Sequence, residues 1–248
     1  MQYDKFNIQE LEERGFNAWP ARHTTHVNGW LIRVGGGLTK RTNSANCLAP
    51  FGSFANVKSA AELIFKRQAL PTIFRITPLV PQGIDRLLEQ DGYTIEDACV
   101  VLAATQDAFR TGSSSNIKLR ATPGEEWRDG VASASAIPAH LRAVHDKLVD
   151  SIQLPAVFAT AYVEDAAAGY AMAVFDRDMI GIFDAVVNQS HRGKGIWQAL
   201  MAKLLQWGKQ QGATAAYFQA TETNEIIRKL GLKLGFREIY HYHYRCRL

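Results

Sequence analysis

The feature that most constrains the fold is an order of elements that occurs twice along the chain. Residues 57–100 follow the pattern helix, short strand, helix, Gly–aromatic pair and strand, and residues 195–245 follow it again. Gly92-Tyr93 in the first copy corresponds to Gly235-Phe236 in the second. Each glycine stands where a helix is expected to end, because glycine readily adopts the left-handed conformation of that position. Two copies of one unit predict an α/β (α+β) protein with a pseudo-repeated, tandem architecture.

A polar segment separates the two halves of the chain. Residues 105–116, "TQDAFRTGSSSN", combine Ser, Thr, Gly and Asn without apolar periodicity, which is typical of a linker. We therefore expect an N-terminal domain over residues 1–104, a linker over 105–116 and a C-terminal domain over 117–248. A chain of 248 residues is long enough for two small domains that each bury a core.

The distribution of charged residues indicates which kind of partner the protein binds. The 28 Lys and Arg residues are scattered among 24 Asp and Glu residues, which gives a net charge of +4 without a basic block. A non-specific nucleic-acid binder usually has a basic stripe with interleaved aromatic residues. The sequence therefore predicts no nucleic-acid partner, and the mild basicity suits a small anionic ligand.

Apolar runs and cysteines indicate the compartment. No apolar run reaches the ~18–20 residues that a membrane span requires, and the N-terminus lacks the apolar core of a secretory signal. The cysteines, Cys47, Cys99 and Cys246, are too far apart for a disulfide framework or a zinc knuckle. These observations predict a cytoplasmic protein without a membrane partner.

The segment "SHRGKGIWQALMAKLL", residues 190–205, combines the elements of an anion site. The first turn of a helix has unpaired N–H groups and a partial positive charge. Gly193 and Gly195 leave the backbone open to a phosphate, while Arg192 and Lys194 add positive charge. Neither the P-loop motif nor the dinucleotide-binding glycine fingerprint is present. Taken alone, the segment also fits an ordinary strand–turn–helix connection.

The flanking residues add a family resemblance. Arg192-x-x-Gly195 follows the strand "IGIFDAVV" and precedes a helix, a strand ending "YFQATETN" and a helix closing on "LGF". This arrangement, over roughly residues 115–245, resembles the GNAT superfamily of acetyl-CoA-dependent N-acetyltransferases. The first half, with "NGWLIRVGGGLTKRTNSAN" and "ITPLVPQGIDRLLEQDGY", resembles the degenerate N-terminal half of tandem-GNAT enzymes. The resemblance implies two GNAT-like units, each a twisted mixed β-sheet flanked by helices, of which only the C-terminal unit binds coenzyme.

The resemblance also implies which residues bind acetyl-CoA. Main-chain amides from Arg192 to Trp197 would hold the pyrophosphate, and the strand before them would pair with the pantetheine arm. Asn224 would contact that arm or order its loop. The implied coenzyme-binding residues are Ala185, Val186, Val187, Arg192, Gly193, Lys194, Gly195, Ile196, Trp197 and Asn224.

Two positions depart from the family pattern. Trp197 stands where the family has a small residue, and its indole could point away from the site, cover the adenine side or block it. Gly231 stands where many members have a tyrosine that acts as general acid. Tyr217, Tyr240 and Tyr242 are possible substitutes, and Tyr240 is our candidate acid. The alternatives are that no acid is needed or that catalysis is impaired.

For the general base the sequence offers Asp184, the only acid in the apolar strand "IGIFDAVV". The competing interpretation is a carboxylate that faces solvent or pairs with a cation. Glu222 is a weaker candidate on a nearby loop.

Other polar residues have simpler explanations. His241 and His243 share one face of a strand without a third ligand, so no metal is expected. His140 and His145 are expected at the surface. The residues around the glycine-rich hairpin, Arg33, Lys40, Arg41 and Asn43, could line an acceptor pocket between the halves, although an exposed basic edge is the favoured interpretation.

The sequence thus predicts an N-acetyltransferase that moves the acetyl group from acetyl-CoA to a primary amine of a small molecule by direct attack in a ternary complex. The alternative is a CoA-binding or interaction module with impaired catalysis. A monomer or homodimer is expected. Family resemblance does not specify the acceptor, so amino acids, polyamines, antibiotics and protein N-termini stay open.

Overall fold

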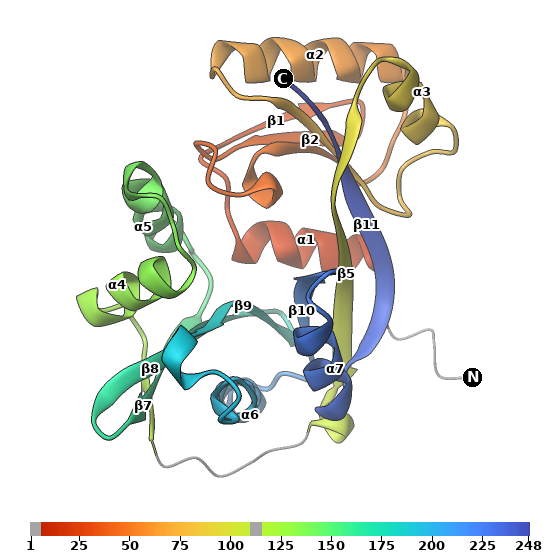
Figure 1. The fold of residues 1–248 in the computed structure, drawn as a ribbon. Helices are drawn as coiled ribbons and strands as arrows, with labels where there is room; N and C mark the ends of the chain where they lie inside the picture. Colours follow the sequence, from red (N-terminus) through yellow and green to blue (C-terminus); the bar gives the residue numbers. More distant parts are fainter. Residues whose placement is uncertain (1–5, 110–115) are drawn as a thin grey trace.

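The strands of the described part of the chain join one mixed sheet. The computed structural model describes residues 6–109 and 116–248. Within them the strand order is β1-β2-β3-β4-β11-β5-β10-β9-β8-β7-β6 (Figure 1). The strands are β1 (His23–Val27), β2 (Trp30–Val34), β3 (Ser44–Cys47), β4 (Thr72–Ile76), β5 (Thr94–Thr105), β6 (Ile117–Arg120), β7 (Ala156–Val163), β8 (Ala166–Asp176), β9 (Met179–Val187), β10 (Ala215–Thr221) and β11 (Arg237–Arg247).

Helices cover both faces of this sheet. The α-helices are α1 (Ile8–Ala18), α2 (Phe54–Arg67), α3 (Ile84–Gln90), α4 (Glu125–Ala134), α5 (Arg142–Asp150), α6 (Ile196–Gln210) and α7 (Glu225–Lys233). Short 3-10 turns lie at Lys40–Thr42, Gln106–Ala108, Ala139–Leu141 and Gln189–His191. The expected mixed sheet flanked by helices is confirmed, and both copies of the repeated helix–strand–helix–strand order are present.

The two halves exchange their last strands. β11, the C-terminal strand, lies between β4 and β5, so that His243 is in register with Ile76 and Tyr242 with Cys99. β5 in turn lies between β11 and β10. Figure 1 shows β5 and β11 as long strands that run together from one half of the molecule into the other. The domain boundaries stay a prediction, and of the expected linker, residues 110–115 lie outside the described part.

Side chains of the central strand β5 are buried on both faces. Val100, Leu102 and Ala104 join a core beneath α6 and α7, while Cys99, Val101 and Ala103 join a second core beneath α1, α4 and α5. A strand that is buried on both faces has a nearly continuous apolar sequence, as "ACVVLAA" does here. A third core packs α2 and α3 against β2, β3 and β4.

The sheet opens between β9 and β10. These strands pair in parallel only from Met179↔Ala215 to Ile182↔Phe218. Beyond that point β9 carries a bulge, where its register with β8 shifts and Asp184 has a φ of 49°. A bulge bends its strand and ends regular pairing. The main chain of β9 after Ile182 therefore has no strand partner on its β10 side, and this opening positions the candidate site.

Candidate active site

A groove of about 510 Å³ lies at the opening between β9 and β10. Its walls are the end of β9, the turn before α6, the first turn of α6 and the start of α7. All the predicted coenzyme-binding residues except Lys194 line this groove. The structure therefore brings together residues that stand on two separate segments of the chain.

The turn before α6 is an open cradle. Gly193 and Gly195 have φ values of 76° and 77°, and nothing lies within 4 Å of a Cβ built on either. No side chain caps the N-terminus of α6 at Gly195, so the N–H groups of its first turn are free to bind an anion. The Nε of Arg192 donates to the main-chain oxygen of Val187 at 3.2 Å, which holds the turn against β9. A phosphate fits these residues in chemistry and in space.

Asn224 closes the groove from the other side. Its side chain caps α7 by accepting from the N–H of Ile227 at 3.3 Å. Asn224 thus orders the start of the helix that lines the groove, and its contact with the pantetheine arm stays a prediction.

Trp197 does not block the groove. Its side chain is buried in the core beneath α6, where the indole meets the ring of Phe218 edge to face at 5.8 Å between centroids. Trp197 still lines one wall of the groove, so the indole forms part of that wall, packed into the core, and does not extend across the opening.

The ring of Phe218 also explains why residue 231 is a glycine and not a tyrosine. A Cβ at residue 231 would lie 2.6 Å from Cζ of Phe218 and 3.1 Å from its Cε1. The contact with Cζ is too close for unchanged packing, so a larger side chain at residue 231 requires the ring of Phe218 to move. The space that a tyrosine of α7 would use is filled by Phe218 in this chain.

Asp184 lies at the bulge of β9 and has a partner that sequence reasoning missed. His145 of α5 places its Nε2 at 2.9 Å from Oδ2 of Asp184, so that the ring nitrogen donates to the carboxylate. His145 is 1% exposed, so the expectation of a surface histidine is wrong, whereas His140 is exposed as expected. The imidazole packs between the indoles of Trp19 and Trp127, at 6.1 and 6.2 Å between centroids.

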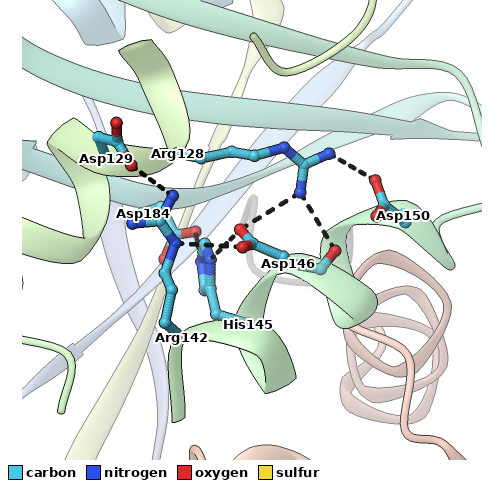
Figure 2. Close-up of polar contacts among 7 residues, drawn as sticks. All are labelled: Arg128, Asp129, Arg142, His145, Asp146, Asp150 and Asp184. Atoms are coloured by element: carbon cyan, nitrogen blue, oxygen red, sulfur yellow. Dashed lines mark hydrogen bonds and ion pairs between the residues drawn. The ribbon is translucent and has the colours of Figure 1, made fainter. Parts of the chain in front are cut away.

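An ionic network fixes α5 against α4 and thereby holds His145. Arg128 of α4 contacts Asp146 and Asp150 of α5, at 3.3 and 2.5 Å. Arg142 of α5 contacts Asp129 of α4 at 2.7 Å (Figure 2). Single exposed ion pairs contribute little, but linked pairs restrict how two helices move against each other.

Tyr240, the candidate acid, lies away from the groove. It stands on β11 in register with Val101 of β5, and its buried hydroxyl donates to Glu12, whose other carboxylate oxygen pairs with Arg75. Burial and the charge of Glu12 raise the pKa of Tyr240. The structure therefore gives Tyr240 a place in a buried network and argues against its role as acid. The reason is that the exchange of β11 places both β5 and β10 between the strand of Tyr240 and β9, which borders the groove.

The other two tyrosines considered as general acid, Tyr217 and Tyr242, are also buried. The Tyr242 hydroxyl donates to Oε1 of Gln219 at 2.7 Å, and the buried Tyr217 hydroxyl has no hydrogen-bond partner among the described residues. Burial raises the pKa of both phenols. Glu222, the second candidate base, has its Oε1 2.6 Å from Nδ1 of His241.

A second cavity, of about 440 Å³, lies between the two halves. Lys40 and Arg41 line it together with Gln219 of β10. Arg33 and Asn43 are buried and brace the loop, since Oδ1 of Asn43 accepts from the N–H groups of Gly35 and Gly37 at 2.9 and 3.0 Å. The favoured interpretation of these four residues as an exposed basic edge is therefore wrong.

The histidines of β11 are engaged by carboxylates. His243 places Nε2 at 3.0 Å from Oδ1 of Asp85, and His241 contacts Glu222. Within residues 6–109 and 116–248, no group of three or more His, Cys, Asp or Glu side chains could hold a metal ion.

The chain matches a known family over almost its whole length. The family model described as "Probable histone acetyltransferase Rv0428c C-terminal" matches residues 6–247. The chain belongs to this family. It is 26% identical over 247 residues to the uncharacterized N-acetyltransferase YobR of Bacillus subtilis (strain 168), with 97% of this chain and 99% of YobR covered. It is 25% identical over 243 residues to the probable histone acetyltransferase Rv0428c of Mycobacterium tuberculosis (strain ATCC 25618 / H37Rv), with 97% and 72% covered.

Solved structures share the fold. A GCN5-related N-acetyltransferase from Kribbella flavida has a TM-score of 0.70 at 13% identity, covering 96% of this chain and 94% of that one. A tandem GNAT protein from the clavulanic acid biosynthesis pathway has a TM-score of 0.66 at 13% identity, covering 96% and 87%. The fold is therefore that of the GNAT acetyltransferases, and the protein is a GNAT-type N-acetyltransferase. In the described part of the chain, no helix has the length and apolarity to cross a membrane.

Proposed function

We propose that the protein moves the acetyl group of acetyl-CoA to a primary amine of a small molecule by direct attack, with both substrates bound at once. The observation that carries this proposal is the groove at the opened sheet, where an anion cradle and a carboxylate held by a histidine border the same strand, β9. The cradle provides the coenzyme site, and the carboxylate provides the base.

The coenzyme side rests on main-chain groups. The free N–H groups of the glycine turn and the first turn of α6 would bind the pyrophosphate, supported by the side chains of Arg192 and Lys194. Residues Ala185–Val187, unpaired on the β10 side, would hydrogen-bond the pantetheine arm and the thioester carbonyl. Acetyl-CoA supplies an activated acetyl group as a thioester.

The chemistry of the acceptor side rests on Asp184. An amine is protonated near neutral pH and must lose a proton before its nitrogen can attack. The Asp184 carboxylate would accept this proton, and the hydrogen bond from His145 would hold it in one orientation. The leaving group, the thiol of CoA, needs no general acid, because a thiol with a pKa of about 8.5 leaves readily as thiolate. The absence of a tyrosine at Gly231 is compatible with catalysis for that reason.

Gly195 offers the sharpest test of the coenzyme site. Gly195→Asp would place a negative charge in the cradle, and Gly195→Asn is the matched control, since it imposes nearly the same backbone strain without the charge. Calorimetry should find CoA binding lost in Gly195→Asp and reduced far less in Gly195→Asn. Equal affinities of the wild type and Gly195→Asp for CoA would refute the assignment of this turn as the pyrophosphate site.

Catalysis is tested separately by thiol release from acetyl-CoA with a panel of amines. Turnover with at least one small amine is expected. Tight CoA binding with no thiol release across the panel would favour the alternative of a coenzyme-binding module.

A further inference from the structure

The cavity between the two halves lies on the opposite side of the sheet from the coenzyme helices. Tyr242, Tyr244 and Cys99 form its inner wall and belong to the core beneath α1, α4 and α5. It also borders β10 at Gln219–Thr221, the segment that follows the last residue paired with β9. An acceptor in this cavity would therefore reach the sheet where β9 and β10 separate. This inference rests on the function proposed above.

Arg41 is the charged residue of this cavity that has no partner. It is half-buried and lines the cavity, yet its guanidinium makes no hydrogen bond or ion pair with any residue in the described part of the chain. Its neighbour Lys40 is fully engaged, with Nζ 2.9 Å from Glu96 and 2.5 Å from Asp97. The carboxylates of Glu96 and Asp97 therefore form ion pairs with Lys40 and not with Arg41.

The charge of Arg41 faces the aromatic wall of the cavity. Burial raises the pKa of Tyr242 and of Tyr244, and the positive charge of Arg41 acts against this rise in both. Arg41, Tyr242 and Tyr244 line the same cavity, which agrees with this influence.

A second positive charge, that of Arg33, lies next to the main chain of Arg41. Arg33 is 3% exposed and donates to the main-chain oxygen of Arg41 at 2.9 Å, and also to Phe16 and Trp19, all of them carbonyls. Burial and the charge of Arg75 lower the pKa of Arg33 to about 10. By contrast, Arg75 itself is paired with Glu12. No carboxylate forms an ion pair with Arg33 or Arg41 in the described part of the chain, although the charge of Glu12 acts on Arg33 from a distance. Of the two, Arg41 is the cation that lines the cavity.

We propose that the acceptor is a small amine that carries a carboxylate, and that Arg41 binds this carboxylate. A guanidinium can hold a carboxylate through two parallel hydrogen bonds, which would fix the position of the amine elsewhere on the same molecule. The cavity of about 440 Å³ has room for a compound the size of an amino acid. The uncompensated positive charge disfavours a lysine-rich peptide.

The experiment compares amines that differ only in this charge. Thiol release from acetyl-CoA is measured with a panel of L-amino acids, with the corresponding amino acid amides, and with a lysine-rich peptide. The wild type should favour acids over their amides in kcat/KM. Arg41→Gln should lower kcat/KM for the acids about 10- to 100-fold, the value of a charge-assisted hydrogen bond, and leave the amides within a factor of about 3. Arg67→Gln, an exposed arginine on the distant α2, is the control and should change neither.

Two results would overturn the inference. One is an equal loss for acids and amides in Arg41→Gln, which would make the residue structural. The other is a preference of the wild type for the peptide. If no amine releases thiol, the proposed function fails, and calorimetry with the N-acetyl forms of the same amino acids and their amides still tests Arg41. Tighter binding of the acids to the wild type than to Arg41→Gln supports the carboxylate site, and equal affinities refute it.

Discussion

Replacing Asp184 by asparagine is expected to remove most of the turnover and to leave the fold intact. The residue adopts a φ of 49° in the bulge of β9, a conformation that Asn tolerates about as well as Asp. The two side chains have nearly the same shape, so the change removes the proton acceptor and little else. Loss of a general base costs about 100- to 10,000-fold in rate, or roughly 3–5 kcal/mol in activation free energy.

The assay is thiol release from acetyl-CoA with the best amine, together with CoA affinity by calorimetry. We expect kcat to fall and CoA affinity to stay as in the wild type. Asp184→Ala should lose the same activity and, in addition, about 1 kcal/mol of stability, because alanine is disfavoured in the left-handed region. If Asp184→Asn keeps more than about a tenth of the wild-type kcat/KM, another group takes the proton and the reasoning is wrong.

His145 is expected to act only through Asp184. His145→Gln keeps a hydrogen-bond donor and should retain more activity than His145→Leu, and both changes should lower kcat with little effect on KM. The double variant His145→Leu/Asp184→Asn should be no slower than Asp184→Asn, since groups that act as one unit are not additive. An additive loss would assign His145 a role of its own.

Gly231→Tyr is expected to destabilise the protein by about 1–3 kcal/mol without restoring any activity, because its Cβ would overlap the ring of Phe218; an unchanged melting temperature would contradict this. Arg75→Met breaks the buried pair with Glu12 and should cost about 3–5 kcal/mol in urea unfolding, whereas a double variant that also replaces Glu12 by Leu should regain only part of it, because the buried Tyr240 hydroxyl then loses its acceptor. Burial raises the pKa of the Cys47 thiol to about 12, so the unfolded chain releases this proton at lower pH than the folded protein does. The free energy of unfolding should therefore fall as pH rises above about 9, with a shallower slope in Cys47→Ala, and equal slopes would refute this cause.

The coenzyme groove could be predicted from the sequence because its parts are local. Residues 185–197 run directly from a strand through a glycine turn into a helix, so their order along the chain fixes their order in space. Gly193 and Gly195 are the residues that such a turn requires, and their positive φ values follow from that geometry.

The partners of the candidate base could not be predicted in this way. His145 and Asp184 are 39 positions apart, and Glu12 and Tyr240 are 228 apart. Nothing in "RAVHDKLVD" distinguishes a buried histidine from an exposed one, because its neighbours are charged. The contacts depend on how α5 and α1 pack on the sheet, and periodicity within one element contains no such information.

The repeat was visible in the sequence, but the exchange of strands was not. Both halves end in a strand after a Gly–aromatic pair, and either strand could complete either half. In the structure β11 completes the N-terminal half and β5 the C-terminal half. The strand β1 was also missed, since "HTTHV" is mostly exposed and shows no apolar alternation.

The exchange of strands gives the N-terminal half a structural role beside the coenzyme groove. The N-terminal half contributes β5 beside β10, the loop with Arg41, and Trp19, whose indole stacks on Phe183 at 5.4 Å. Residues 117–248 alone would expose the β5-facing edge of β10 and leave β11 without either neighbour. Because unpaired strand edges associate, we expect this fragment to aggregate in size-exclusion chromatography and to become soluble on co-expression with residues 1–109. A monomeric 117–248 fragment that binds CoA with wild-type affinity would show that the C-terminal half forms its site without the exchanged strand.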